Sequence, residues 1–152
     1  DRQEYANFSI PYREETSNAY CLIDICSKAK SLNQVMALDD KIQVLFNSKA
    51  WIGNAFEKLT KKYNDRFHHI DSTERRLQML KRGRAAITIE DQLSFPFIAK
   101  EVDFDINKFS TLTVYKTKVH FMFSKKNISK DFIVQFNNIL QQELAISNKE
   151  SM

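Results

Sequence analysis

The chain has very little glycine, and this scarcity excludes one large class of function. Only two of its 152 residues are glycine. A phosphate-binding loop needs several glycines close together, because its backbone must turn sharply and approach the phosphates. We therefore expect no nucleotide site of the familiar kinds, and no cofactor is predicted.

Long apolar runs and clusters of metal ligands are missing as well. No segment approaches the roughly 18 apolar residues that span a bilayer, and no signal peptide precedes Asp1, so the protein is expected to be intracellular or to have lost its start. His68 and His69 are neighbours on a predicted strand and point to opposite faces, while His120 stands alone. We expect no metal site, no cysteine–histidine nucleophile and no enzyme activity from these residues.

The charge is nearly balanced, which argues against nucleic acid as a partner. Lysine and arginine number 23 and aspartate and glutamate 19, a net charge of +4, and the basic residues are spread along the chain. The densest basic stretch, RRLQMLKRGR at residues 75–84, has the apolar spacing of a helix. We interpret it as a solvated helix face.

The two cysteines are predicted to be unpaired. Cys21 and Cys26 lie in the segment CLIDIC, which has the composition of a strand. On a strand they would be about 16 Å apart and on opposite faces, too far for a disulfide. They are therefore interpreted as two small buried hydrophobic residues.

Strand-like and helix-like segments alternate along the chain. Strands are predicted at 19–26, 41–46, 66–71, 85–90 and, as a longer extended run, 111–123, with a short connector at 31–40. One helix is predicted at 52–63, and a second begins at an Asp71–Glu74 capping box and ends at Gly83. A third begins at Asp91 and is disturbed by Pro96. The last helix follows Ser129, which is its expected cap. This alternation indicates an α/β fold with a mainly parallel sheet covered by helices.

Four local patterns occur in an order that carries a resemblance. They are RQEYANFSIPY near the start, LDDKIQVLFNS, LKRGRAAITIED, and VHFMFSKKN before the last helix. They are spread over nearly the whole chain, from residue 2 to residue 127, and the sequence resembles the bacterial extracellular solute-binding proteins of family 3, the amino-acid-binding kind. The resemblance implies a type II periplasmic-binding-protein fold. By that resemblance residues 18–118 are nearly all of lobe two, 1–17 are a lobe-one and hinge fragment, and 119–152 are a return strand and C-terminal helix toward lobe one.

The resemblance also implies three ligand-binding residues. Arg2 would pair with the α-carboxylate of an amino acid through two parallel N–H groups. Ser48 would supply a hydroxyl at the start of a helix over 50–64, and Asp91 would hold the α-amino group. The family usually has glycine or a small residue where this chain has Asn47, and threonine is commoner than serine at position 48. The alternatives are a solvated charge for Arg2, a helix cap for Ser48, and a cap of the next helix for Asp91.

The function that the resemblance implies is the capture of a small polar solute, an amino acid, in the periplasm for uptake through the membrane subunits of an ABC transporter. One alternative is the ligand-sensing input domain of a membrane signalling protein. Another is a domain preceding a peptidoglycan-cleaving module, with the catalysis outside these residues. By the resemblance, lobe one is incomplete in this chain. One interpretation is that the chain is a piece of a longer protein. The other is that a short protein is completed by a partner or by exchanging segments between copies. The apolar face of the last helix (Phe132, Phe136, Ile139) then predicts a homodimer or a swapped assembly.

Overall fold

The computed structural model describes residues 2–150, and the side chains of residues 2–147. The strands are β1 (Ala6–Leu22), β2 (Val44–Phe46), β3 (Phe67–His69), β4 (Ile87–Asp91) and β5 (Phe109–Ser124). The helices are α1 (Ile23–Cys26), α2 (Leu32–Leu38), α3 (Gly53–Lys62), α4 (Thr73–Lys81), α5 (Phe95–Glu101) and α6 (Lys130–Glu150), with short 3-10 turns η1 (Arg2–Glu4), η2 (Asn64–Arg66) and η3 (Ile106–Lys108). No helix within the described residues is long and apolar enough to cross a membrane.

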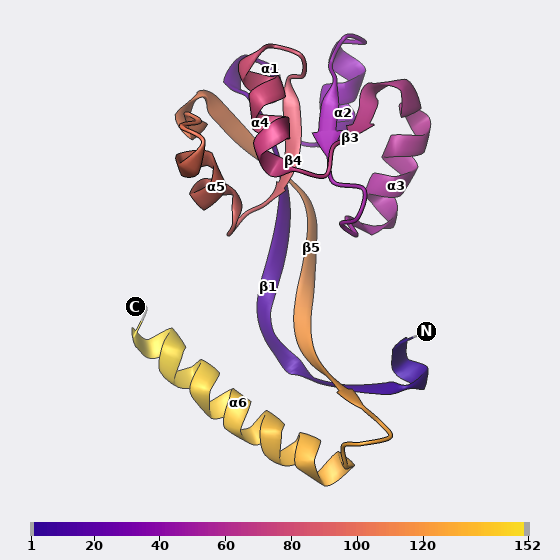
Figure 1. Ribbon diagram of the computed structural model, residues 1–152, viewed down its shortest axis with the longest axis vertical. Coiled ribbons are helices and arrows are strands. Elements are labelled where there is room, and N and C mark those ends of the chain that lie inside the picture. Colours follow the sequence, from indigo (N-terminus) through magenta and orange to yellow (C-terminus); the bar gives the residue numbers. More distant parts are fainter. Residues whose placement is uncertain (1, 151–152) are drawn as a thin grey trace. The chain divides into compact units, whose positions relative to one another are not determined.

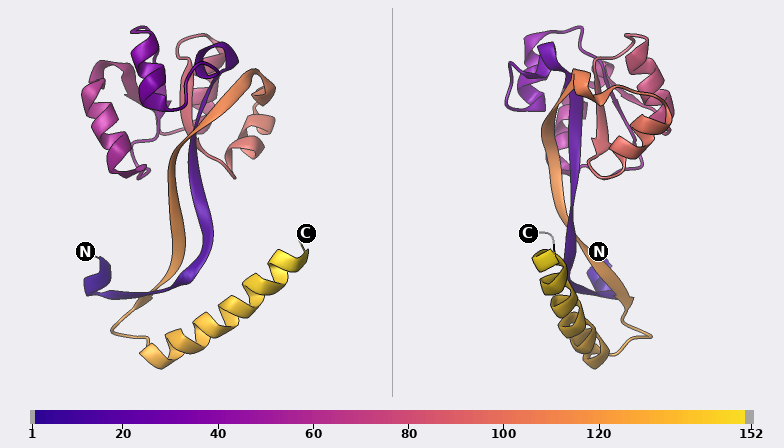
Figure 2. Two further views of the ribbon diagram at one scale, coloured as in Figure 1. Left: turned by 180° about the vertical axis from the view of Figure 1, so that it is seen from behind. Right: turned by 90° about the vertical axis from the view of Figure 1, so that its left-hand side faces the viewer.

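The chain divides into two compact units. Unit 1 contains residues 1–14 and 117–152, and unit 2 contains residues 15–116. The boundary therefore falls within β1 and within β5, the two longest strands, which lie side by side in all views (Figures 1 and 2). The assignment of these parts to lobes and hinge stays a prediction.

The sheet has the strand order β3-β2-β4-β1-β5 within the described part of the chain. β2 runs parallel to both β3 and β4, whereas β1 pairs antiparallel to β4. The predicted α/β fold is thus confirmed, with the three parallel strands together on one side of the sheet. Because β2, β3 and β4 point the same way, the segments after them emerge at one edge of the sheet.

Alternating side chains give unit 2 a core on each face of its sheet. Ala19, Cys21, Val44 and Ile87 pack with residues of α2 and α3, such as Met36 and Phe56. Their neighbours on the strands, Tyr20 and Leu45, pack with residues of α4 and α5, such as Leu77 and Phe95. Figure 1 shows the two helix pairs on opposite sides of these strands. This is the arrangement expected when a period-2 strand is buried on both faces.

The structure corrects the predicted pairing state of the cysteines. Cys21 and Cys26 form a disulfide, with their Cα atoms 5.7 Å apart. The predicted strand over 19–26 is wrong at its second half, because β1 ends at Leu22 and Ile23–Cys26 is a helical turn. A helix rises about 1.5 Å per residue, less than half the rise of a strand, so the turn brings the two sulfurs together. Both side chains are buried, as expected.

Three further expectations about local structure are wrong. The segment at 31–40 contains helix α2, and the Ser31 hydroxyl accepts a hydrogen bond from the Gln34 amide. Helix α4 is capped by Ser72 rather than Asp71, since the Ser72 hydroxyl accepts from the Arg75 amide. Pro96 does not disturb α5, because it lies in the first turn, where its missing N–H has no helical partner to lose. The Ser129 cap of α6 is confirmed by a 3.2 Å bond from the Phe132 amide.

Unit 1 is held by aromatic contacts and by a few partly buried hydrogen bonds. The Phe121 amide donates to the Ser9 hydroxyl at 2.9 Å, and the Ile10 amide donates to the Asn137 side chain at 3.0 Å. The ring of Phe136 on α6 lies 5.2 Å from Phe121 and 5.0 Å from Phe123 on β5, edge to face. These contacts fasten α6 to the strands of its own unit.

Candidate functional site

A small cavity of about 190 Å³ lies in unit 2, where β2 and β4 end. It is lined by Ser17, Asn47, Ala50, Ile52, Thr73, Arg76, Ile89, Glu90, Asp91 and Ser94. In open α/β sheets, ligands bind outside the carboxyl ends of the strands, where this cavity lies. It is smaller than the roughly 300–1,000 Å³ typical of pockets for drug-sized ligands, so it suits one end of a small solute.

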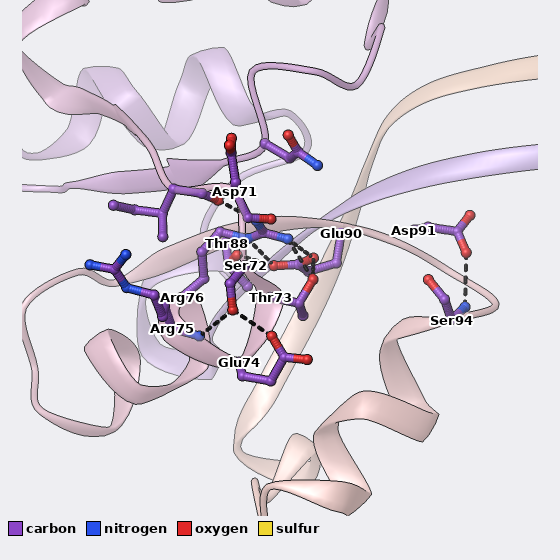
Figure 3. A network of polar contacts seen from close by, with 12 residues as sticks. Asp71, Ser72, Thr73, Glu74, Arg75, Arg76, Thr88, Glu90, Asp91 and Ser94 are labelled. Carbon is purple, nitrogen blue, oxygen red and sulfur yellow. Dashed lines mark hydrogen bonds and ion pairs between the residues drawn. The ribbon is translucent and has the colours of Figure 1, made fainter.

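Asp91 lines this cavity and has one carboxylate oxygen that takes part in no hydrogen bond among the described residues. Its Oδ1 atom accepts a hydrogen bond from the amide of Leu93 at 3.1 Å. It also accepts one from the amide of Ser94 at 2.8 Å (Figure 3). Within the described residues no hydrogen bond reaches Oδ2. The alternative role of Asp91 as the cap of the next helix is not observed, because the N-cap of α5 is Ser94 and the two Asp91 bonds close the turn before it. The remaining oxygen is available to a cationic or hydrogen-bond-donating ligand group.

Beside Asp91, Arg76 and Glu90 form a buried, two-pronged ion pair. Arg76 Nε and Nη2 donate to the two Glu90 oxygens at 2.6 Å each, and the side chains are only 3% and 5% exposed. The other N–H groups of Arg76 donate to the carbonyls of Ile70 and Asp71 and to the Thr73 hydroxyl. Thr88 also donates its hydroxyl to Glu90 (Figure 3). All five donors of the guanidinium are satisfied, which a buried arginine requires.

The loop after β2 places Asn47, and not Ser48, in the Asp91 cavity. Asn47 Oδ1 accepts from the Lys49 amide at 2.9 Å, and the Asn47 carbonyl accepts from the Ala50 amide at 3.1 Å. Ser48 is exposed and lines a neighbouring hollow with Trp51. The amides of Lys49 and Ala50 thus already donate to acceptors within the loop. The ligand role of Ser48 stays a prediction.

Helix α3 begins at Gly53, and this glycine is needed there. Its φ is +83°, and a Cβ added to it would lie 2.6 Å from the ring of Tyr115. Any other residue would clash and strain the backbone, so the glycine fixes how the loop joins the helix. The helix starts three residues later than the predicted 50–64 element.

An exposed ion pair bridges the loops after β2 and β3. Lys49 Nζ lies 2.7 Å from Asp71 Oδ2, with both side chains largely solvated. The hydrogen bond from Lys49 lowers the pKa of the Asp71 carboxyl from its ordinary value. On the same loop, the Ser72 hydroxyl donates to Glu74 and lowers the pKa of that carboxyl. Both carboxylates therefore stay ionised further into acid than free side chains do.

Arg2 lies in the other unit. It belongs to the 3-10 turn η1, and its side chain is exposed. The structure therefore brings Asp91 together with Asn47, Arg76 and Glu90 in one cavity of unit 2, and Ser48 lines a neighbouring hollow instead. Within the part of the chain that the structure describes, no group of three histidine, cysteine or acidic residues could hold a metal ion.

Arg76 and Glu90 are the site residues that the sequence analysis missed. The stretch 75–84 was interpreted as a solvated face, which is wrong for Arg76, since that residue is 2% exposed. A signal was present, because Arg76 lies next to Leu77 and four residues before Leu80, on the apolar side of the helix. For Glu90, the signal was an acidic residue within the strand ITIED, whose other residues are mostly suited to burial. A buried carboxylate needs a charged partner.

Comparison with known proteins identifies the fold. No family profile matches the sequence, and no curated protein matches it. Among solved structures, the "Ancestral Cationic Amino Acid Solute Binding Protein (AncCDT-1)" is similar with a TM-score of 0.68 at 17% identity, over 99% of this chain and 61% of that one. The fold is that of the amino-acid solute-binding proteins.

Two bacterial proteins show the same likeness. The "probable amino-acid ABC transporter extracellular-binding protein ytmK" from Bacillus subtilis has a TM-score of 0.63 at 17% identity, covering 96% of this chain and 65% of its own. A mutant of ArgBP from T. maritima has a TM-score of 0.59 at 17% identity, covering 97% and 59%. The chain thus spans about 60% of the length of these proteins. The resemblance seen in the sequence is confirmed at the level of the fold.

Proposed function

We propose that this chain is a large part of a solute-binding protein that captures a small polar solute, an amino acid, for uptake by an ATP-driven membrane transporter. The observation that carries the proposal is that Asp91, which has one free carboxylate oxygen, lines a cavity at the carboxyl ends of β2 and β4. A carboxylate facing a ligand ammonium is a charge-assisted contact. Arg2 would meet the α-carboxylate, and closure around the solute would favour one state by contacts that the open state lacks.

The proposed activity is binding without chemistry. A solved structure of AncCDT-1 is described as an amino-acid-binding protein, "a precursor of cyclohexadienyl dehydratase", so the fold is compatible with either role. In this cavity both oxygens of Glu90 are engaged by Arg76 and by hydroxyl groups, which leaves Asp91 as the acid with a free oxygen. That arrangement favours holding a cation over transferring protons.

The disulfide supports the proposed periplasmic location. Disulfides form and persist in oxidising compartments and are rare in the cytosol. Cys21 and Cys26 are joined, which fits a protein that folds outside the cytosol. The signalling alternative shares this location, and the two differ in the stretch of the gene downstream of Met152. A stop codon there favours transport, and a transmembrane helix favours a sensory input domain.

The direct test is a thermal-shift screen of the chain against the 20 amino acids, with Asp91→Ala beside it. A ligand that binds only the folded state raises the melting temperature by mass action. We expect a shift with one amino acid or a related group of them, and its loss in the variant. Repeating the screen on the full-length gene product separates a missing binding lobe from a wrong proposal. No shift with any amino acid there would overturn it.

A further inference from the structure

Two adjacent acidic residues at the end of β4, Glu90 and Asp91, have different surroundings. Glu90 is closed into the ion pair with Arg76, whereas Asp91 keeps one oxygen free. The buried pair is unusual, because removing two charges from water costs several kcal/mol per ion unless their geometry repays it. A plain structural role would be served as well by apolar residues, so the question is what the pair does for its neighbour.

The end of β4 lacks support on one side, and the pair provides it. Pairing with β1 continues through Ser17 and Asp91, and the Gln92 amide donates to the Thr16 carbonyl at 2.9 Å. On the other side, pairing with β2 stops at Thr88. Beyond that point Arg76 of α4 clamps Glu90, and the same guanidinium holds the carbonyls of Ile70 and Asp71 (Figure 3). The strand end that carries Asp91 is therefore held by the main chain of β1 and by the side chain of Arg76.

The pair also determines the charge that the cavity offers to a ligand. The charges of Arg76 and Glu90 cancel, and so do those of Lys49 and Asp71 in the adjacent loops. Because every N–H of Arg76 is already used, this arginine cannot also receive a solute carboxylate. Asp91 is left as the uncompensated charge among the residues that line the cavity.

We infer that Arg76 is a positioning residue. By pairing with Glu90, it holds the Asp91 carboxylate in place and leaves the Asp91 cavity with a net negative charge that suits the cationic end of a solute. The inference rests on the proposed function for its ligand but not for its geometry. It separates Arg76 from the other buried arginine of unit 2, Arg66. That guanidinium holds the carbonyls of Met36, Asp39 and Ile42 and does not line the cavity.

The test without ligand compares the same change at the two arginines. Arg76→Lys keeps the charge but loses the two-pronged geometry, since an ammonium is a point donor. We expect the amides of Leu93 and Ser94, which bond Asp91, to exchange with solvent several-fold faster in Arg76→Lys, measured by NMR. Arg66→Lys should leave those two amides unchanged. Equal exchange in wild type and Arg76→Lys would overturn the positioning role.

The test with ligand uses L-arginine as the probe, measured by calorimetry on the same variants. Arg76→Lys should weaken binding about tenfold, the equivalent of about 1.4 kcal/mol, and Arg66→Lys should not. If the full-length gene product binds neither L-arginine nor any other amino acid, the proposed function fails while the exchange result still decides the positioning role. Equal affinities in wild type and Arg76→Lys would contradict the inference.

A double variant covers the case in which Arg76→Lys fails to fold. In Arg76→Met/Glu90→Leu both charges are gone, and apolar replacement of a whole buried pair is often tolerated. We expect this variant to keep its circular dichroism spectrum and cooperative unfolding, while Leu93 and Ser94 exchange faster. A folded double variant with unchanged exchange at these amides would show that the pair does not hold Asp91.

Discussion

Units 2 and 1 bury their large apolar side chains to different extents. In unit 2, residues such as Leu45, Leu77, Ile87 and Phe95 are fully buried in the two cores that flank the sheet. In unit 1, the buried residues among those described are Ala6, Ser9 and Ile133. Unit 2 therefore has two closed apolar cores, whereas unit 1 is held mainly by aromatic contacts at a partly solvated surface.

Unit 1 also leaves large apolar side chains of α6 exposed to solvent. Phe132, Ile139 and Ile146 are 47%, 60% and 52% exposed. They are spaced seven residues apart, so they follow one stripe along the helix. The lesson is that an amphipathic helix does not by itself make a core, because its apolar side also needs a surface to cover it.

Aromatic truncations give the sharpest test of this comparison. Phe95→Ala removes a buried ring that packs 4.0 Å from the ring of Tyr20, and should cost about 3–5 kcal/mol of unfolding free energy. Phe97→Ala, in the same helix but 74% exposed, should stay within about 0.5 kcal/mol of wild type. Urea titrations followed by circular dichroism measure both. If Phe136→Ala in unit 1 costs as much as Phe95→Ala, the two units are equally well packed and the comparison fails.

The disulfide should matter to unit 2 alone. Cys21 and Cys26 close a short loop, and the chain-entropy relation gives about 2 kcal/mol for a loop of this length. Adding a phosphine reductant should lower the urea midpoint of unit 2 accordingly. The Cys21→Ala/Cys26→Ala variant, which has no bond to lose, should not respond to the reductant. An unchanged midpoint for reduced wild type would contradict this expectation.

The exposed stripe on α6 should cause weak self-association. Light scattering at increasing concentration should show an apparent mass that rises toward about twice the monomer, as in a symmetric dimer. Ile139→Glu should return the chain to a monomer, because the change puts a charge in the contact. Gln141→Glu, the same charge at an exposed polar position, should have no effect. A monodisperse monomer at all concentrations would count against the contact.

The smallest expected effect is the acid dependence from Asp71. Its pKa is lowered in the folded state, so its ion pair with Lys49 adds stability above the ordinary carboxyl pKa of about 3.9. That contribution is lost as the pH falls through the lowered pKa. NMR titration of the Asp71 carboxyl should show a midpoint below the ordinary value, and Lys49→Ala should raise it. Lys58→Ala, an exposed lysine on α3, is the matched control and should leave the midpoint in place.

Local patterns were sufficient wherever one element has one strong period. The extended run at 111–123 and the helix at 52–63 correspond to β5 and α3 within a few residues. Short elements were missed, because α2 has 7 residues and α1 has 4, fewer than a periodic pattern needs. Of the candidate site, only Asp91 could be located from the sequence and also lies in the cavity. Asn47 replaces the expected Ser48, since the loop folds back through bonds of the Asn47 side chain to its own backbone.

The sequence by itself determined the α/β alternation and the resemblance to the amino-acid solute-binding proteins, because strand and helix periods and short motifs are local properties. Only the tertiary structure decided three other features. The turn after Leu22 brings Cys21 and Cys26 together, and the parallel strands bring the loops after β2 and β4 to one cavity. Packing of α4 against β4 then buries Arg76 on Glu90. Each depends on residues far apart along the chain or on a change of chain direction, which no local period records.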